Sequence, residues 1–451
     1  MAYLLTVSGL RGIVGRDLTP DVVLEYSAAL ATLFGPDKTY IVGRDTRPHG
    51  PTFRDAAIAG ISAVGGDVID VGIVPTPTLL FNVRNWIEDT GGGIVITASH
   101  NPIEWNALKF VRPDGLFLFQ KDVEKLIEIY ERKSWEWKEW NGVGRIEEYA
   151  GAIDNHINAV VTSDYLDLDS IMDAGLKVAI DAVNGANWFA LPALMNALGT
   201  NVIRLNCEPT GIFPHVPEPR REHLDDLNKI LESGAADLGF ATDPDGDRLL
   251  AGIKGRGLLT EEHTIAIAAW AVLERYRGPI VVNLSTSMMV EDVAKHFGVP
   301  VYRTKVGEAN VVEGIFKYNA VIGGEGNGGV ILPDINPTRD SLVGAALITQ
   351  LAVSGELEHI LSHLGDYTML KGKIPRKGDF NPEDVISEFS DCVESNTIDG
   401  AYIRFDSAWI HMRPSNTEPI IRIYVEGDSE KRARELMDRA LAVLKNLQGE
   451  A

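Results

Sequence analysis

The sequence predicts an α/β protein that consists of three related α/β domains and a smaller C-terminal α+β domain. Three times along the chain, an apolar stretch typical of a buried strand leads into a turn rich in Gly, Asp, Asn or Ser and then into a helical pattern. A strand followed by a helix is the unit from which parallel α/β layers are built. The last part of the chain differs, because several strand-like stretches there precede one charged helix.

The three α/β segments share a plan but little residue-level similarity, so the repetition is one of architecture. The strands with their turns are predicted at residues 40–45, 178–185 and 280–287, and the helices that follow them from about Thr52, at 188–198 and at 288–297. The tail is predicted to form strands at 401–405, 408–413 and 420–426 and an amphipathic helix at 429–447.

A chain of 451 residues is too long for one ordinary domain. We expect four domains: residues 1–148, 149–252, 253–369 and 370–451. The Trp-rich stretch at residues 134–140 lies near the first boundary. It is interpreted as a connector that tryptophan side chains pin to the surface, rather than as a platform that stacks a sugar or cofactor.

The composition is that of a soluble globular protein, with 45% hydrophobic and 24% charged residues. No apolar stretch approaches the length of a membrane span, and the N-terminus has no apolar core of a secretory signal. The chain has two cysteines, Cys207 and Cys392, which cannot build a disulfide framework or a thiolate metal cluster. These features predict a location in the reducing cytoplasm.

The formal net charge of −22 argues against nucleic acid or an anionic membrane as a partner. The same charge repels phosphorylated small molecules at long range. A phosphate-binding site on this protein therefore needs local arginines, lysines and backbone amides that reverse the sign of the field.

One candidate site is the hydroxyl of Ser99, which follows the apolar run at residues 94–96. A serine at a strand end commonly caps a turn. Here the glycines at residues 91–93 and the small Ala98 permit a tight turn, His100 and Asn101 add polar groups beside the hydroxyl, and Lys109 follows closely. These neighbours favour a functional serine.

A second candidate is the turn at residues 243–248, in which Asp243, Asp245 and Asp247 alternate with Pro244 and Gly246. A buried strand at 237–242 leads into it. Oxygen ligands of this kind suit Mg²⁺ and leave positions for a phosphate oxygen. A solvated acidic turn is the alternative, but carboxylates this close repel each other without a cation. An EF-hand is a poor fit, since Arg248 and Lys254 stand where Gly and Glu belong.

Two further loops carry ligand-binding residue types. Residues 413–419 combine a guanidinium, hydroxyls and an amide in the manner of a phosphate cradle, although a plain hairpin loop has similar composition. Residues 323–329 are rich in glycine, with Glu325 and Asn327 able to bind sugar hydroxyls, although alone they indicate only a flexible turn. The isolated basic residues Arg11, Arg44, Lys305 and Arg422 are weak signals individually.

Taken together and in this order, the motifs resemble those of the α-D-phosphohexomutase family. The matching segments are residues 8–12, the serine loop, the D-x-D-x-D loop, the Gly–Glu loop and the R-P-S-N-T-E-P loop, and the resemblance spans the chain. It implies four domains around a central cleft, each contributing one loop. The implied enzyme is a phosphosugar mutase of the isomerase class, a monomer or homodimer that acts on a small phosphosugar.

The resemblance also implies roles for individual residues. Ser99 would carry a covalent phosphate, and Asp243, Asp245 and Asp247 would hold Mg²⁺ together with it. His100, Lys109 and Arg11 would transfer protons or stabilise charge. The substrate would be bound by Arg248, Lys305, Glu325, Asn327, Arg413, Ser415, Asn416, Thr417 and Arg422.

The implied reaction interconverts a hexose or hexosamine 6-phosphate and its 1-phosphate through a hexose 1,6-bisphosphate intermediate, which also acts as activator. The sugar is the open point. The loops are most similar to phosphoglucosamine mutases, and phosphomannomutase and phosphoglucomutase are the alternatives. Departures from the family pattern occur at Ala107, at residues 327–329 and at 338–341.

Two other readings remain. In a haloacid-dehalogenase-type phosphatase, Asp243 would be the nucleophile of a D-x-D-G motif, but Ser99 and residues 413–417 would have no role. A non-catalytic sensor of sugar phosphates would need no reactive serine, so Ser99, His100 and Lys109 favour an enzyme.

Overall fold

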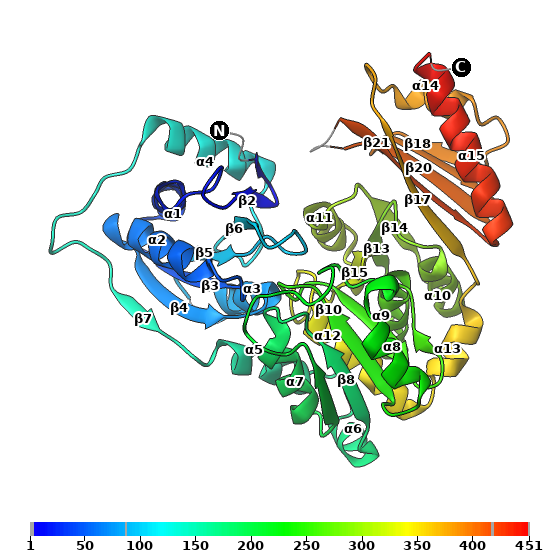
Figure 1. The fold of residues 1–451 in the computed structure, drawn as a ribbon, viewed down its shortest axis with the longest axis horizontal. Coiled ribbons are helices and arrows are strands. Elements are labelled where there is room, and N and C mark those ends of the chain that lie inside the picture. Colours follow the sequence, from blue (N-terminus) through cyan, green and yellow to red (C-terminus); the bar gives the residue numbers. More distant parts are fainter. Residues whose placement is uncertain (1–3, 86–87, 416–418, 450–451) are drawn as a thin grey trace. The chain divides into compact units, whose positions relative to one another are not determined.

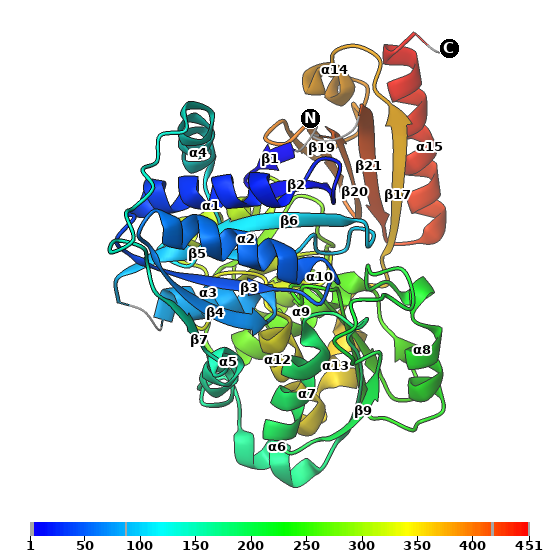
Figure 2. The same cartoon turned by 60° about the vertical axis from the view of Figure 1, so that its left-hand side comes forward.

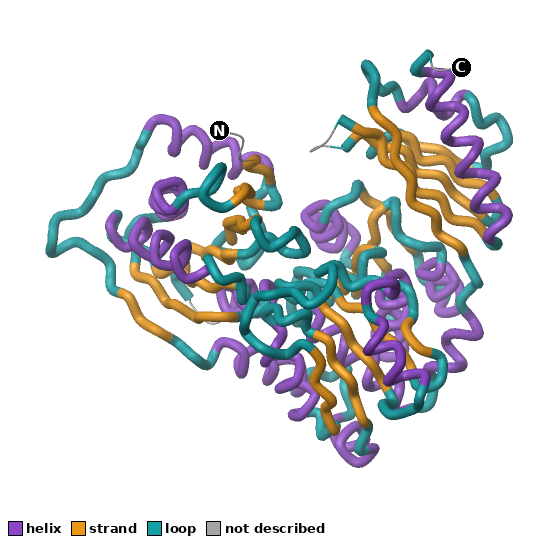
Figure 3. The backbone as a smooth tube through the Cα atoms, viewed as in Figure 1, coloured by secondary structure: helices purple, strands orange, loops and turns teal. Residues whose placement is uncertain are grey.

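The structure is a computed structural model that describes residues 4–85, 88–415 and 419–449. The chain forms two compact units. Unit 1 consists of residues 1–264 and 327–355, and unit 2 of residues 265–326 and 356–451. Both contain sheets covered by helices, as Figure 3 shows by colour. The predicted class, α/β domains with a C-terminal α+β domain, is confirmed.

The first sheet of unit 1 has the strand order β1-β2-β6-β5-β3-β4-β7. Its strands are β1 (Leu4–Thr6), β2 (Gly9–Ile13), β3 (Thr39–Arg44), β4 (Asp67–Ile73), β5 (Thr90–Ile96), β6 (Trp105–Val111) and β7 (Ile146–Glu148). Strands β5, β3, β4 and β7 are parallel neighbours, whereas β1, β2 and β6 pair antiparallel on the other side of β5.

Helices cover both faces of this sheet, as side-chain alternation along β3 requires. Tyr40 and Val42 belong to the core formed with α1 (Pro20–Phe34) and α2 (Gly50–Ala63). A side chain at Gly43, on the opposite face, would collide with Leu79 of α3 (Thr76–Asn85). Figure 2 shows α1 and α2 lying along the sheet, with α4 (Gln120–Arg132) beyond α1.

The second sheet of unit 1 has the order β12-β11-β10-β8-β9, in which β10, β8 and β9 are parallel, β11 is antiparallel to β10, and β12 is antiparallel to β11. Its strands are β8 (Lys177–Asp181), β9 (Asn201–Leu205), β10 (Leu238–Thr242), β11 (Leu249–Ile253) and β12 (Gly257–Leu258). The helices of this part are α5 (Ala152–Val161), α6 (Leu168–Ala174), α7 (Asn187–Ala197), α8 (Asp225–Glu232) and α12 (Ser341–Ser354), with a short 3₁₀ helix at Arg221–His223. Strand β16 (Gly329–Ile331) precedes α12.

Unit 2 contains parallel strands β14, β13 and β15 and a separate antiparallel sheet with the order β17-β21-β20-β19-β18 (Figure 1). The strands are β13 (Ile280–Asn283), β14 (Val301–Thr304), β15 (Ile322–Glu325), β17 (Thr368–Pro375), β18 (Glu394–Asn396), β19 (Ala401–Phe405), β20 (Ala408–Pro414) and β21 (Ile420–Gly427). The helices are α9 (Glu261–Arg275, most of it in unit 2), α10 (Met289–Phe297), α11 (Glu308–Tyr318), α13 (Leu357–His363), α14 (Pro382–Ser387) and α15 (Glu430–Leu447).

The antiparallel sheet packs one face against α15, whose apolar side includes Leu436 and Leu444. Ser429 caps the start of α15 by accepting a hydrogen bond from the Arg432 amide, as serine at an N-cap commonly does. Among the described helices, none combines the length and the apolar character that crossing a membrane would require.

Two local expectations need correction. The glycines at 91–93 do not form a turn but are part of β5, where a side chain at Gly91 or Gly93 would collide with the neighbouring strand β3. In the Trp-rich connector only Trp135 packs against the core, whereas Trp137 and Trp140 are 50% and 89% exposed. A single tryptophan therefore pins this segment.

Candidate active site

The serine loop begins where β5 ends, at the carboxyl end of a parallel strand. Ser99 is buried and adopts the left-handed conformation, with φ of 52°. This region is unfavourable for residues other than Gly, Asn and Asp, so the surrounding structure must hold Ser99 in it. The Ser99 hydroxyl donates to Asp243 Oδ2 at 2.9 Å and lies 3.3 Å from His100 Nδ1.

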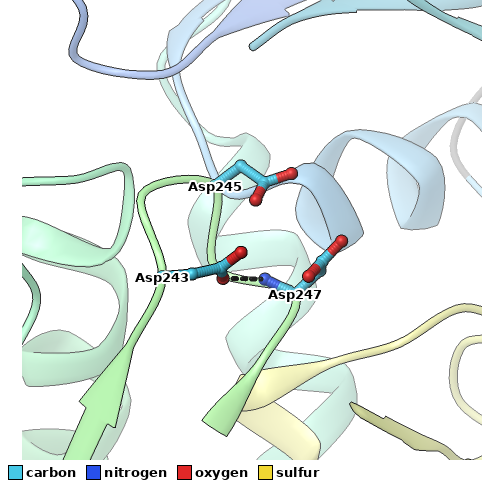
Figure 4. A group of neighbouring side chains, drawn as sticks. All are labelled: Asp243, Asp245 and Asp247. Atoms are coloured by element: carbon cyan, nitrogen blue, oxygen red, sulfur yellow. Dashed lines mark hydrogen bonds between the residues drawn. The ribbon is translucent and has the colours of Figure 1, made fainter. Parts of the chain in front are cut away.

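The three aspartates of the D-x-D-x-D loop connect β10 to β11 and converge as expected (Figure 4). Each offers an oxygen within 4.8 Å of the other two. Asp243 Oδ1 accepts the backbone amides of Asp247 and Arg248, both at 3.1 Å, which closes the turn. Gly246 has φ of 71°, and a side chain there would collide with Asn187, so only glycine fits.

The carboxylates differ in proton affinity. Burial, followed by the charges of Asp245 and Asp247, raises the pKa of Asp243 well above its usual value. Burial also disfavours ionised Asp245, but Lys109 and hydrogen bonds outweigh it and lower the pKa of Asp245. Such divergence among adjacent acids is typical of functional sites.

Two cations reach these carboxylates from other elements. Lys109, on β6, places Nζ 2.5 Å from Asp245 Oδ2 and 3.4 Å from Asp247 Oδ2. Burial disfavours its ammonium form, but the two aspartates outweigh this effect and raise the pKa of Lys109. Lys109 is therefore protonated near neutral pH. The second cation is Arg339, which donates to Asp247 Oδ2 at 2.6 Å.

His100 differs from Lys109 in that its side chain is uncharged. The charge of Arg248, then burial and the charge of Arg11, lower the pKa of His100 well below 6.5, so its imidazole is neutral. Arg11 donates to Asn101 Oδ1 at 2.7 Å, and Arg248 donates to Glu218 Oε1 at 3.1 Å. Arg11, Ser99, His100, Lys109, the three aspartates and Arg248 are thus all neighbours within unit 1.

The aspartate loop fits a hard divalent cation. Its three carboxylates are at most 1% exposed, and within the described parts of the chain Asp245 Oδ1 and Asp247 Oδ1 have no hydrogen-bond donor. Buried carboxylate oxygens without donors are costly unless a cation coordinates them. The donor set contains only oxygen, which selects Mg²⁺ or a similar ion over softer metals.

The other predicted substrate-binding residues that the structure describes lie in unit 2, except Asn327, which lies in unit 1. Glu325 is buried at the end of β15, where Oε1 accepts from Asn283 Nδ2 at 2.8 Å and the Gly307 amide at 3.1 Å. The Gly-rich stretch is therefore mostly strand rather than a loop. Lys305 is exposed beyond β14. In unit 1, Asn327 Oδ1 accepts the Gly329 amide at 3.3 Å and shapes the turn.

The terminal loop joins β20 to β21. Arg413 stands opposite Arg422 in the strand register, and Arg422 stands opposite Lys373 of β17. Like charges directly opposite destabilise a sheet unless anions neutralise them, and a phosphate is one anion that could bind to this row. Asp399 lies 3.4 Å from Arg413 Nε, and the Ser415 amide donates to Ile420 O. Asn416 and Thr417 lie outside the described residues.

Several residues near the site were missed at the level of sequence. Thr76, at the start of α3, donates through its amide to Asp245 O and through its hydroxyl to Asp245 Oδ2, both at 2.8 Å. Ser341 donates to Gly246 O at 2.6 Å. In the sequence, the segment at 338–341 stands out only as a departure from the family pattern, although it supplies Arg339. Thr76 gives no comparable signal.

Comparison with known proteins matches each part of the chain to one family. Residues 4–137, 154–256 and 260–367 match the α/β/α domains I, II and III of phosphoglucomutase/phosphomannomutase, and residues 369–443 match its C-terminal domain. The chain belongs to the phosphoglucomutase/phosphomannomutase family. This phosphohexomutase is therefore an enzyme of the phosphosugar mutase class, as its motifs predicted.

Individual relatives cover nearly the whole phosphohexomutase. It is 35% identical to a probable phosphoglucosamine mutase of Methanopyrus kandleri, over 97% of each chain. It is 36% identical to a phosphoglucomutase/phosphomannomutase of Thermococcus kodakarensis, over 98% of this chain and 99% of the relative. The crystal structure of a phosphoglucomutase/phosphomannomutase family protein from Burkholderia thailandensis is similar, with a TM-score of 0.85, 26% identity and 98% coverage of each chain.

Proposed function

We propose that this phosphohexomutase interconverts hexose or hexosamine 6-phosphates and 1-phosphates through phospho-Ser99 and a hexose 1,6-bisphosphate. The observation that carries the proposal is the Ser99 hydroxyl, which lies 2.9 Å from Asp243 Oδ2 at the edge of a buried carboxylate cluster. A hydroxyl beside a cation site can exchange a phosphoryl group, whereas a structural serine has no need of one. Mg²⁺, held by Asp243, Asp245, Asp247 and Ser99, would neutralise charge on the phosphoryl group.

The protein groups divide the work of transfer. A sugar hydroxyl attacks phosphorus, the bond from phosphorus to Ser99 Oγ breaks, and the hydroxyl proton leaves. His100 is neutral and can accept a proton, whereas Lys109 is protonated and can stabilise the charge of the transferring group. Arg11 and Arg248 add positive charge. In the second half-reaction the bisphosphate returns its other phosphoryl group to Ser99.

Substrate recognition beyond the reacting phosphate is assigned to the remaining residues. Arg413, Ser415, Asn416, Thr417 and Arg422 would bind the phosphate that does not react, and Glu325, Asn327 and Lys305 would bind the sugar. The row of cations at Arg413 and Arg422 supports the phosphate assignment. The domain division at residues 148, 252 and 369 remains a prediction, as do a cytoplasmic location and a monomeric or homodimeric state.

Glucosamine phosphate is the favoured substrate, because the relative from Methanopyrus kandleri carries the name of a probable phosphoglucosamine mutase. Glucose and mannose phosphates are the alternatives, since the relative from Thermococcus kodakarensis is named for them. Rates with the three 6-phosphates, measured side by side on one preparation, decide between them. The favoured sugar is wrong if glucose 6-phosphate or mannose 6-phosphate gives a higher kcat/KM than glucosamine 6-phosphate.

The mass of the intact protein tests the covalent step. After incubation with glucose 1,6-bisphosphate, one phosphoryl group should appear, and peptide mapping should place it on Ser99. A phosphoryl group on Asp243 would instead support the phosphatase alternative. A protein that is never phosphorylated, although folded and supplied with Mg²⁺, would contradict the proposed mechanism.

A further inference from the structure

A buried arginine lies directly beneath the serine loop. Arg47 has no exposed surface, and its guanidinium donates to three backbone carbonyls of one turn. Nη2 bonds to Ser99 O at 2.8 Å and to Asn101 O at 2.7 Å, and Nη1 bonds to Pro102 O at 2.9 Å. The planar, forked guanidinium is the side chain that can serve three such acceptors together.

The same arginine is linked back to Ser99 through two other side chains. Arg47 Nε donates to Asp45 Oδ2 at 3.0 Å, and the Thr97 hydroxyl donates to the same oxygen at 2.6 Å. Thr97 Oγ1 in turn accepts the Ser99 amide at 3.0 Å. The chain of contacts therefore begins at the carbonyl of Ser99 and ends at its amide.

This closed network accounts for the backbone of Ser99. Its φ of 52° is unfavourable for serine, and the hydrogen bonds to its amide and carbonyl both come from the network. Asp45, Arg47 and Thr97 are at most 1% exposed, so none of them can touch a substrate. The ring of Phe213, 5.0 Å from the guanidinium carbon, covers Arg47 further.

We propose that Arg47, Asp45 and Thr97 are positioning residues that hold Ser99 in the left-handed conformation from which its hydroxyl exchanges phosphoryl groups. The inference rests on the proposed function of Ser99. If these side chains only filled space in the core, charged groups would not be needed there, because apolar side chains would fill the same space without the cost of desolvating charges. Small misplacements of a reacting group are costly, and hence the network should act on the rate of transfer rather than on binding.

Thr97→Val tests the network, because valine keeps the shape of threonine and removes both hydrogen bonds. The rate of Ser99 phosphorylation by glucose 1,6-bisphosphate, followed by intact mass, should fall at least about tenfold, with KM changed less than about threefold. Thr97→Ser, which retains the hydroxyl, should restore the rate to within about threefold of wild type. Thr349→Val is the matched control, since it removes a buried hydroxyl of α12 that bonds to its own helix at 2.7 Å. Its rate should equal that of wild type.

The outcomes separate the two proposals. If wild type accepts phosphoryl on Ser99 and Thr97→Val does so at the same rate, the network has no positioning role. The same conclusion follows if the loss appears only in KM, or equally in Thr349→Val. If wild type accepts none, the proposed function itself is wrong and the network has no nucleophile to position. Should Thr97→Val fail to fold, Arg47→Lys carries the test, because lysine keeps the charge but cannot reach three carbonyls. It should show the same loss of rate at an unchanged KM.

Discussion

At the scale of single residues, Ser99 and the aspartates face each other across parts of the chain that are far apart in sequence. The hydrogen bond from Ser99 to Asp243 joins residues separated by 144 positions. Each partner was nevertheless predicted, because each sits in a local motif whose residue types indicate its chemistry. The contact between them could not be read from either motif, since only the fold brings the two turns together.

Ser99→Ala should abolish steady mutase turnover and leave the protein folded. Alanine removes the group that carries phosphoryl between half-reactions, while the buried turn loses one hydroxyl. Turnover with hexose 6-phosphate and catalytic amounts of bisphosphate is the measurement, with circular dichroism as the check on folding. Ser163→Ala, which removes a hydroxyl bonded to the end of α5, is the control and should be fully active. Turnover by Ser99→Ala near the wild-type rate would refute the assignment.

Asp245→Asn should weaken Mg²⁺ binding at least about tenfold, because it removes one of three convergent charged ligands. Activity of wild type should disappear with a strong chelator and return with added Mg²⁺. Calorimetric titration of both proteins with Mg²⁺ measures the change. Asp237→Asn provides the control, since Asp237 pairs with Lys254 outside the cluster. Equal Mg²⁺ affinity in wild type and Asp245→Asn would show that the loop holds no metal.

Arg413→Ala should lower kcat/KM about ten- to a hundredfold in both directions, because a charge-assisted contact to phosphate is worth roughly 1.5–3 kcal/mol. Both monophosphates should be affected, since each presents its non-reacting phosphate to the same group. Phosphorylation of Ser99 as isolated should persist, as measured by mass. Arg439→Ala removes a half-buried arginine that pairs with Asp391 and serves as control. Unchanged kcat/KM in both directions would show that the loop is a hairpin turn without a role in phosphate binding.

At the scale of elements, three of the site residues lie at or just beyond the carboxyl ends of parallel strands. Ser99 follows β5, Asp243 follows β10, and Glu325 is the last residue of β15. Strands β5 and β10 were predictable because they contain apolar runs with turn residues behind them, whereas residues 323–325 of β15 were expected to lie in a turn. Strands such as β1, β2 and β7 were not predictable, because they are short or exposed and lack a clear alternation.

Strand β20 depends on a neutral histidine. His411 Nε2 donates to Asp399 O at 2.6 Å, so Nδ1 accepts the Ser285 hydroxyl at 2.8 Å. Burial lowers the pKa of His411 to about 4, and the charges of Arg413 and Arg303 act in the same direction, against Asp399. An unfolded histidine has a pKa of about 6.5, so the unfolded chain binds this proton more readily.

The stability contributed by neutral His411 should therefore be complete above about pH 6.5 and be lost as the pH falls toward about 4. Between pH 7 and pH 5 the loss from this group should be about 2 kcal/mol. Urea denaturation of wild type and His411→Asn at both pH values isolates the contribution of His411 to the free energy of unfolding, because all other titratable groups are common to the two proteins. The expectation fails if both proteins lose the same free energy of unfolding on acidification.

At the scale of the whole molecule, the order of the motifs was the strongest signal, because four loops matched one family in sequence. The identity of the sugar was not accessible in the same way. In the proposed function, the groups that would distinguish an amino group from a hydroxyl include Glu325, whose Oε1 accepts hydrogen bonds from Asn283 and Gly307. Specificity at that level depends on hydrogen-bond geometry, which residue types alone do not determine.

The supporting contacts of the site were also inaccessible from sequence. Arg339 reaches Asp247 from 92 positions away, and Thr76 reaches Asp245 from 169 positions away. Neither residue lies in a sequence motif that indicates a ligand-binding site. Only the closed fold of unit 1 shows that they hold the aspartate loop.

Unit 1 is discontinuous in the chain, and this governs how it can be made. The chain leaves unit 1 after residue 264 and returns at 327–355 with β16 and α12. The returning segment supplies Arg339 and Ser341, which bond to Asp247 and Gly246. During synthesis the aspartate loop therefore emerges from the ribosome well before the segment that secures it. A chain that stalls before residues 339–341 have emerged yields an N-terminal fragment that contains every proposed cation ligand, but whose aspartate loop lacks the hydrogen bonds from Arg339 and Ser341.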